Sequence, residues 1–144
     1  MSTAGFQKII AASVENRADL FLTTANRLGV PLINIEKDFW VCWTLNALYH
    51  RLPAGGPRLL FKGGTSLSKA YGLINRFSED IDVTVFRDDL GHGATPEALA
   101  ALSGKKRKAA IEAIQTDCQA YITGPLLAEL SQLITEDTGG EGRI

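Results

Sequence analysis

The chain has 144 residues, of which 45% are hydrophobic and 22% are charged, as expected for one soluble domain with a core of its own. Its formal net charge is −1, so overall charge gives no reason to expect binding to nucleic acid or to a membrane surface. The composition therefore excludes functions that depend on a strong overall charge.

Neither a targeting segment nor a membrane segment is visible in the sequence. Residues 1–6 lack the basic and apolar parts of a secretory signal, and the apolar stretch at residues 39–48 is shorter than the roughly 20 residues that span a bilayer. Cys42 and Cys118 have no partner at metal-ligand spacing, which favours two buried free thiols in a reducing compartment. We expect a cytoplasmic protein without a membrane partner.

The first part of the chain predicts two helices. Apolar residues recur at helical spacing over residues 6–28, and Gly29 is a typical C-terminal cap. A second helix is predicted over residues 34–51. Its centre, around Trp40 and Trp43, is apolar on nearly every side, so both indole rings are expected in the core.

The middle of the chain predicts two strands. Residues 58–62 are typical of a short buried strand, and residues 80–86 alternate polar and apolar residues and are rich in Ile and Val. A short helix is predicted between them at residues 66–71. Together with the helices, this pattern predicts an α/β fold of the α+β kind, with a small mixed sheet flanked by helices.

The last part of the chain again predicts helices. Residues 105–122 have an amphipathic pattern that opens with four consecutive basic residues, and helical spacing resumes over residues 126–134. Gly124 and Pro125 are expected to interrupt the helix. The basic run at residues 105–108 suits contact with RNA phosphates; the alternative is a solvated helix face.

Gly63 and Gly64 follow the first predicted strand directly, with Thr65 and Ser66 after them. Two glycines at a strand end let the backbone turn sharply and let a phosphate approach closely, because no Cβ stands in the way. A following helix points its free N–H groups at that phosphate. We expect a phosphate-binding turn; the alternative is a turn without a ligand. A P-loop is excluded because the lysine precedes the glycines.

Asp80 and Asp82 are two residues apart on the second predicted strand, so their side chains project from the same face. Their carboxylates repel each other unless a cation neutralises them, and Mg²⁺ commonly bridges one or two carboxylates to substrate phosphates. An acidic pair beside a glycine-rich phosphate site suits metal-assisted displacement at the α-phosphate of a nucleotide. The alternative is a solvated strand face.

Three segments carry a resemblance to a known family. Residues 61–69 read Phe-Lys-Gly-Gly-Thr-Ser-Leu-Ser-Lys, residues 76–82 read Arg-Phe-Ser-Glu-Asp-Ile-Asp, and residues 36–41 read Glu-Lys-Asp-Phe-Trp-Val. In these segments the chain closely resembles the AbiEii family of nucleotidyltransferase toxins, which belongs to the DNA polymerase β-like nucleotidyltransferase superfamily. The resemblance covers about residues 34–86.

The resemblance implies roles for particular residues. Asp80 and Asp82 would be catalytic and would hold Mg²⁺ or Mn²⁺. The resemblance further implies that the protein is a bacterial toxin with a separate antitoxin protein as partner. Its substrate would be a nucleoside triphosphate, and its acceptor would be tRNA or another RNA. The triphosphate would be held by residues of the first motif, namely Gly63, Gly64, Thr65, Ser66 and Lys69.

One feature of the superfamily is missing from the predicted elements. Its members usually carry a third acidic residue on a later strand, and no later strand is predicted after residue 86. Relatives are also longer, with a further helical part, so we expect residues 1–144 to be one nucleotidyltransferase-like domain, the N-terminal part of a longer protein. The later acidic residues fall in predicted loops or helices: Asp88, Asp89, Asp117 and Asp137.

The sequence thus favours Mg²⁺-dependent transfer of a nucleotide from a nucleoside triphosphate to an acceptor such as tRNA, by the toxin of a bacterial toxin–antitoxin or abortive infection system. The alternative is a truncated module that binds a nucleotide or a protein partner without turnover.

Overall fold

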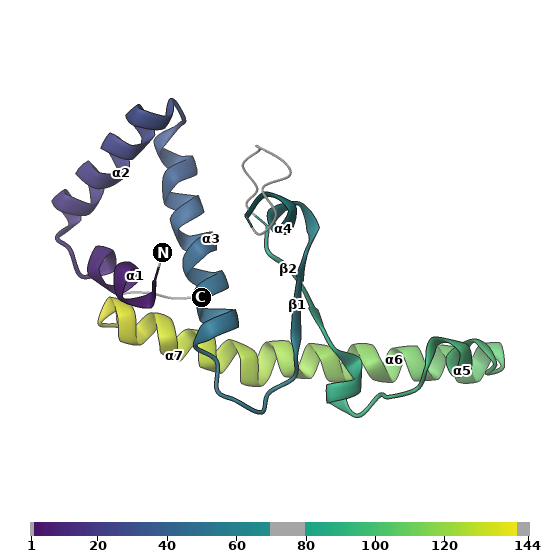
Figure 1. Ribbon diagram of the computed structural model, residues 1–144. Coiled ribbons are helices and arrows are strands. Elements are labelled where there is room, and N and C mark those ends of the chain that lie inside the picture. Colours follow the sequence, from purple (N-terminus) through teal and green to yellow (C-terminus); the bar gives the residue numbers. More distant parts are fainter. Residues whose placement is uncertain (1, 70–79, 141–144) are drawn as a thin grey trace.

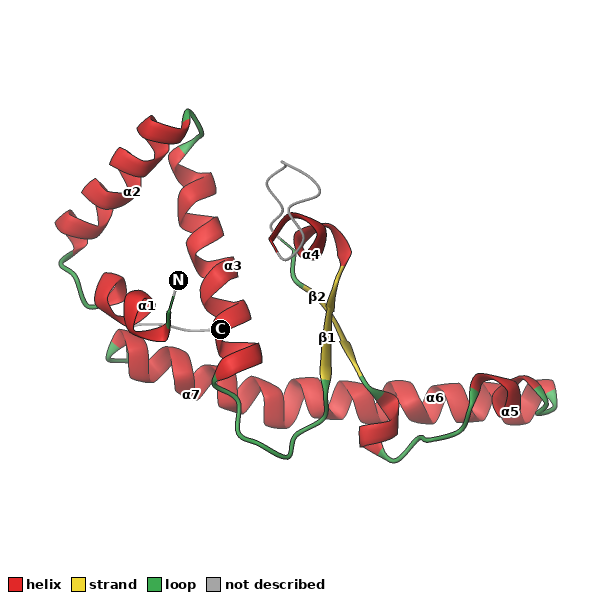
Figure 2. Cartoon of the chain, in the orientation of Figure 1, coloured by secondary structure: helices red, strands yellow, loops and turns green. Residues whose placement is uncertain are grey.

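The computed structural model describes residues 2–69 and 80–140, so predictions for residues 70–79 lie outside the described residues. Helices dominate the described chain, and one pair of strands stands among them (Figure 2). This arrangement confirms the predicted α+β class. In chain order the elements are α1 (Thr3–Ile10), α2 (Val14–Leu28), α3 (Leu32–His50), β1 (Leu59–Lys62), α4 (Gly63–Lys69), β2 (Asp82–Val85), the 3₁₀-helix η1 (Arg87–Leu90), α5 (Pro96–Ala100), α6 (Gly104–Tyr121), the π-helical turn η2 (Ile122–Leu126) and α7 (Leu127–Thr138).

The first predicted helix is two helices, and the prediction of one helix over residues 6–28 is wrong. The helix α1 ends at Ile10, and α2 begins after Ser13, whose side chain accepts a hydrogen bond from the backbone N–H of Asn16. A serine in this position competes with a continuous helix because its hydroxyl satisfies a free N–H group of the next one. The predicted end at Gly29 is confirmed, since Gly29 caps α2 with a left-handed φ of +66°.

The hydrophobic core lies where α1, α2, α3 and α7 meet, on one side of the molecule (Figure 1). Trp43 of α3 is at its centre and is only 2% exposed. The prediction that Trp40 also belongs to the core is wrong, because Trp40 is 37% exposed. The two rings are three residues apart on the helix, and the core is too small to cover both. The buried residues of the core are Phe6, Ile10, Phe21, Phe39, Trp43, Ala47 and Ile134.

The strands β1 and β2 form an antiparallel pair in which Lys62 lies opposite Asp82 and Phe61 opposite Val83. Because side chains alternate along a strand, Phe61 and Val83 share one face, and Lys62 and Asp82 share the other. The first face is turned toward α3, where the Phe61 ring centroid lies 6.3 Å from that of Tyr49. The second face is open, and its residue Leu60 is 50% exposed.

The last helices form one long rod along the base of the molecule (Figure 1). Gly124 and Pro125 interrupt the α-helix as predicted, because α6 ends at Tyr121 and α7 begins at Leu127. The chain nevertheless stays helical: η2 carries it through both residues in a wider turn, which accommodates the missing N–H of proline. The far half of the rod, α6, has no buried residue. It extends away from the core as an arm, with α5 folded back on it. In the described part of the chain, no helix combines the length and apolarity that a bilayer crossing requires.

Candidate functional site

The candidate site lies at the end of the strand pair where β1 passes into α4. Gly63 has a φ of +77°, a conformation that residues with a side chain rarely adopt. A Cβ built on Gly63 would lie 1.9 Å from Oδ2 of Asp82 and 2.8 Å from its Cγ. The side chain of Asp82 therefore rests directly on the backbone of Gly63. The structure brings together the first glycine and the second aspartate that the sequence placed in one site.

Both aspartates of the pair are exposed, whereas Ile81 between them is half-buried. Ile81 and Trp40 border the same surface hollow, which is built mainly from α3. The strand β2 begins at Asp82, so the prediction that Asp80 also lies on this strand is wrong: Asp80 precedes the strand, and strand alternation does not place the two carboxylates on one face. Exposed carboxylates are the kind of oxygen ligand that a hard cation such as Mg²⁺ prefers.

Lys62 is a residue of this face that the sequence analysis did not include in the site. It is exposed and lies directly opposite Asp82 in the strand register, on the open face. Its ammonium group adds positive charge to the place where a triphosphate would meet the acidic pair. Strand alternation together with an antiparallel pairing would have indicated that Lys62 lies beside Asp82. The register of two strands, however, cannot be predicted from the sequence of either strand alone.

All five predicted nucleotide-binding residues lie in α4, which begins at Gly63 rather than at residue 66 as predicted. Gly64 is half-buried, and the side chain of Thr65 lies outside the described residues. Ser66 is buried, with only 5% of the residue exposed. Of the residues predicted to hold the phosphate, Gly63 and Lys69 are exposed.

Lys69 at the end of α4 forms an ion pair with Asp38 of α3, and both side chains are partly exposed. The pair joins two of the segments that carry the family resemblance, residues 36–41 and 61–69. Asp38 was not predicted as a site residue. Lys69 could bind a phosphate only if its ion pair with the carboxylate of Asp38 were broken.

The later acidic residues are engaged elsewhere. Asp89 accepts two hydrogen bonds from the Arg58 guanidinium, at 2.8 and 3.0 Å, and these bonds lower the pKa of Asp89. This pair lies at the opposite end of the strands from Asp82, because Arg58 precedes β1. Asp117 of α6 lies 2.7 Å from Nε2 of His92. In the described ranges, no group of three or more His, Cys, Asp or Glu side chains could hold a metal ion.

Asp137 of α7 belongs to the scaffold. Its carboxylate accepts hydrogen bonds from Nη1 and Nη2 of Arg51 at 2.5 and 3.1 Å, from Nε1 of Trp43 at 2.8 Å, and from Gln7 at 3.0 Å. The side chain is 1% exposed. Burial raises the pKa of Asp137, but the hydrogen bonds from Arg51, Gln7 and Trp43 outweigh it, so the pKa is lower than its usual value.

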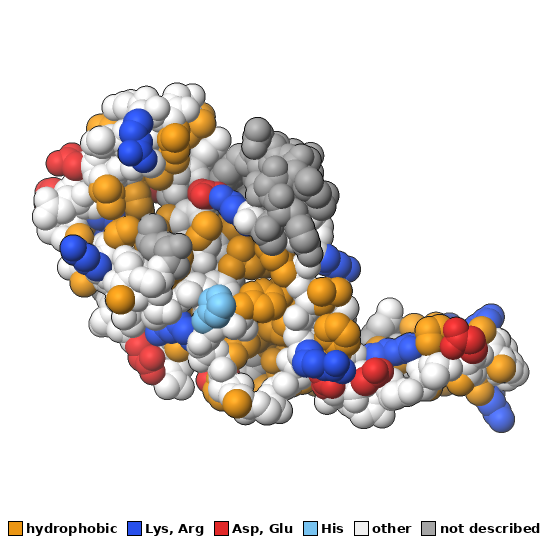
Figure 3. Space-filling view, viewed as in Figure 1, with side chains coloured by type: hydrophobic (Ala, Val, Ile, Leu, Met, Phe, Trp, Pro, Cys, Tyr) orange, Lys and Arg blue, Asp and Glu red, His pale blue; other side chains and the backbone are white. Residues whose placement is uncertain are grey.

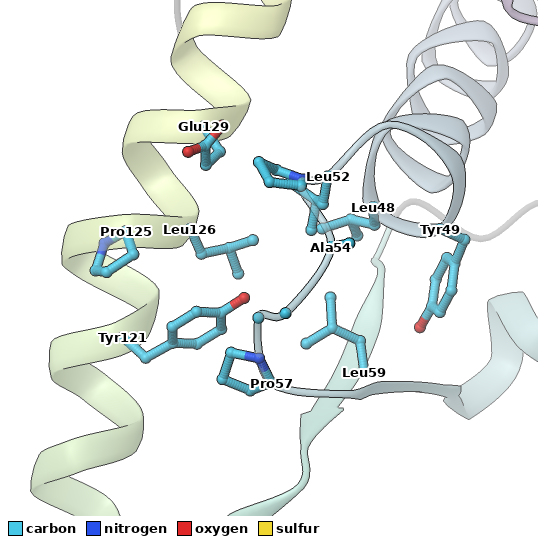
Figure 4. Close-up of a pocket in the computed structure, with 13 residues that line it drawn as sticks. Leu48, Tyr49, Leu52, Ala54, Pro57, Leu59, Tyr121, Pro125, Leu126 and Glu129 are labelled. Carbon is cyan, nitrogen blue, oxygen red and sulfur yellow. The ribbon is translucent and has the colours of Figure 1, made fainter. Parts of the chain in front are cut away.

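A separate pocket of about 380 Å³ lies on the other side of the strands, between the loop before β1 and the rod (Figure 4). Leu52 and Pro57 of the loop face Tyr121 and Leu126 of the rod across it (Figure 4). Burial raises the pKa of Tyr121. No residue of the candidate site lines the pocket. The pocket is the space between the loop and the rod where these two segments meet.

A family model described as "Nucleotidyl transferase AbiEii toxin, Type IV TA system" matches residues 46–139, which is well over half of the chain. The chain belongs to the AbiEii family. The match includes the whole strand pair, α4 and both aspartates, and it continues through the rod to α7. Searches of curated proteins and of solved structures found no match.

The extent of the AbiEii match differs from the resemblance seen in the sequence. The resemblance centred on residues 34–86, whereas the family model starts at Asn46 and reaches residue 139. Asp38 and Trp40 lie before the matched region, so their place beside the site is a finding of the structure alone. The later helices, in contrast, are part of the family's domain. As an AbiEii toxin, the protein is a nucleotidyltransferase-family member of a toxin–antitoxin system, which implies an antitoxin as partner.

Proposed function

We propose that this AbiEii-family protein is a metal-dependent nucleotidyltransferase that transfers a nucleotide from a nucleoside triphosphate to an RNA acceptor, such as tRNA, in the cytoplasm. The observation that carries the proposal is the contact between Asp82 and Gly63, because it joins an acidic side chain to a backbone that only glycine fits. An acidic pair and a close phosphate approach are the two parts that nucleotidyl transfer requires on this side of the site.

Asp80 and Asp82 are the residues that would hold a divalent cation, Mg²⁺ or Mn²⁺. Their donor set fits such an ion, because both carboxylates are exposed and hard divalent cations prefer oxygen ligands. When bound, the cation supplies charge neutralisation at the phosphates and favours the displacement. The missing side chain of Gly63 lets the Asp82 carboxylate lie against the backbone, and Lys62 adds positive charge from the same face of the strand pair.

Catalytic action further requires a group that accepts the proton of the attacking hydroxyl. Three aspartates after β2 are already paired: Asp89 with Arg58, Asp117 with His92, and Asp137 with Arg51. We infer that a group other than these three aspartates accepts the proton.

The second candidate is a module that binds a nucleotide or the antitoxin without turnover. The observation that favours it is that, within the described ranges, no third His, Cys, Asp or Glu side chain completes a metal site with the two aspartates. The two candidates differ in one respect: only the first transfers a nucleotide to an acceptor.

The experiment that separates them is incubation of the protein with each radiolabelled nucleoside triphosphate, Mg²⁺ and total tRNA. We expect label from one triphosphate to enter RNA, and we expect Asp82→Asn to abolish the transfer. The variant Asp117→Asn removes a carboxylate from α6 instead and should retain full activity. Calorimetric binding of a triphosphate without any transfer would favour the second candidate.

A further inference from the structure

The arm formed by α6 begins with a run of four basic residues, Lys105–Lys108, and each of them is exposed. These four hold a large share of the 15 basic residues of a chain whose net charge is −1. Positive charge is therefore concentrated on the arm, far from the core. Figure 3 shows lysine and arginine side chains around the free end of the arm.

The basic run surrounds the helix. Successive residues of an α-helix are rotated by about 100°, so four in a row point to all sides of the axis. A solvated helix face would carry charge on one side and would balance it with acidic residues one turn away. Here Lys108 has a loose partner in Glu112 at 3.8 Å, and among the described residues no ion pair or side-chain hydrogen bond involves the side chains of Lys105, Lys106 or Arg107.

The position of the run is electrostatically unfavourable in the free protein. The N-terminal end of a helix is the positive end of its dipole and favours acidic residues. The first turn of α6 contains none, and its N-cap residue Ser103 makes no side-chain cap hydrogen bond. Four cations at this end repel the dipole and one another. An anionic partner that contacts the helix from several sides would relieve this repulsion.

We infer that the basic run of α6 binds the phosphate backbone of RNA and thereby holds the acceptor for the site on the strand pair; this inference rests on the proposed function. An RNA strand presents phosphates around a helix, whereas an acidic protein surface would meet one face of it. Residues 96–120 contain no aromatic residue, so bases have no ring to stack on. The arm contributes charge attraction without sequence preference.

The test uses the whole chain and a fluorescein-labelled RNA hairpin, with binding followed by anisotropy at several salt concentrations. The variant Lys106→Gln/Arg107→Gln should bind the hairpin about tenfold more weakly, and its slope of log K against log salt should fall by about two. The matched control is Lys8→Gln/Arg27→Gln, which removes one exposed lysine and one exposed arginine from α1 and α2. We expect control and unmodified protein to bind alike, with circular dichroism equal for all three.

Equal losses of hairpin affinity in the two double variants would overturn the inference, because positive charge anywhere on the protein would then suffice for RNA binding. Capture of polyglutamate with no binding of the hairpin would also overturn it, in favour of an acidic protein partner. The variant Asp82→Asn separates this inference from the proposed function. It should still bind the hairpin while losing nucleotide transfer, so a failure of RNA binding and a failure of the chemistry are distinct results.

Discussion

Gly63 is the residue at which backbone conformation and side-chain chemistry meet. Its positive φ disfavours any side chain, and the carboxylate of Asp82 occupies the place of a Cβ. The two effects have different consequences. Left-handed φ costs stability wherever it occurs, but only a displaced Asp82 changes the metal site. A variant can therefore separate the two.

We predict that Gly63→Ala weakens binding of Mn²⁺ and triphosphate at least about tenfold, because the new Cβ forces the Asp82 carboxylate to rotate away. The left-handed backbone should lower the free energy of unfolding by about 1–2 kcal/mol. The matched control is Gly91→Ala: Gly91 has a φ of +85°, but a Cβ there would have open space around it. Calorimetry and urea denaturation check both variants.

Gly91→Ala should lose similar stability and leave binding unchanged. If both variants bind the metal and the nucleotide normally, the contact between Gly63 and Asp82 is not part of a binding site.

At the scale of elements, α4 is held between the strands and α3. It begins where β1 ends, and at its other end Lys69 pairs with Asp38. The ion pair therefore either tethers α4 or competes with a phosphate for the same ammonium group. The proposed function favours competition, because an exposed ion pair contributes little to stability.

We predict that Asp38→Asn strengthens triphosphate binding by about two- to fivefold, the range that corresponds to an exposed ion pair of up to about 1 kcal/mol. Lys69→Gln should weaken binding by a similar factor, because it removes the cation. Titration of a fluorescent triphosphate analogue measures both. Losses of equal size in the two variants would contradict a phosphate contact and would identify the pair as a tether of α4.

At the scale of the whole molecule, Asp137 links the last helix to the first and the third. It accepts hydrogen bonds from Gln7 of α1 and from Trp43 and Arg51 of α3, and its side chain is 1% exposed. The core is thus closed by a buried, charge-assisted network, and the strand pair stands outside it. Damage to this network should unfold the scaffold rather than alter the site.

We predict that Asp137→Asn lowers the free energy of unfolding by about 3 kcal/mol at pH 7, because it leaves the largely buried Arg51 without its counter-charge. The control Asp117→Asn loses only an exposed contact with His92 and should change stability by less than about 1 kcal/mol. Urea denaturation measures both. Equal destabilisation by the two substitutions would show that Asp137 has no special place in the scaffold.

The lowered pKa of Asp137 sets the pH dependence of this contribution. A carboxyl group with a depressed pKa in the folded state stabilises the fold above its unfolded pKa, here near 3.8, and loses that contribution as the pH falls through the folded pKa. We predict that the difference in stability between the unmodified protein and Asp137→Asn is constant above about pH 5 and shrinks below pH 3.8. A difference that persists unchanged at pH 2 would contradict this assignment.

The sequence alone predicted the local chemistry of this protein. The resemblance of residues 36–41, 61–69 and 76–82 to the AbiEii family predicted the family, which the comparison confirmed. The helices over most of α2, α3, α6 and α7 were predicted as well, since apolar spacing and caps are local signals. The error in the first helix arose where local signals compete, because Ser13 caps a new helix within an apolar pattern that continues through it.

The tertiary structure alone decided which distant residues meet. The register placed Asp82 on Gly63 and opposite Lys62, α3 brought Asp38 to Lys69, and the small core buried Trp43 but left Trp40 exposed. None of these contacts follows from spacing along the chain, because each depends on how two elements pack and how much surface the core can cover. Sequence patterns specify which face of an element is apolar, whereas packing determines what that face meets.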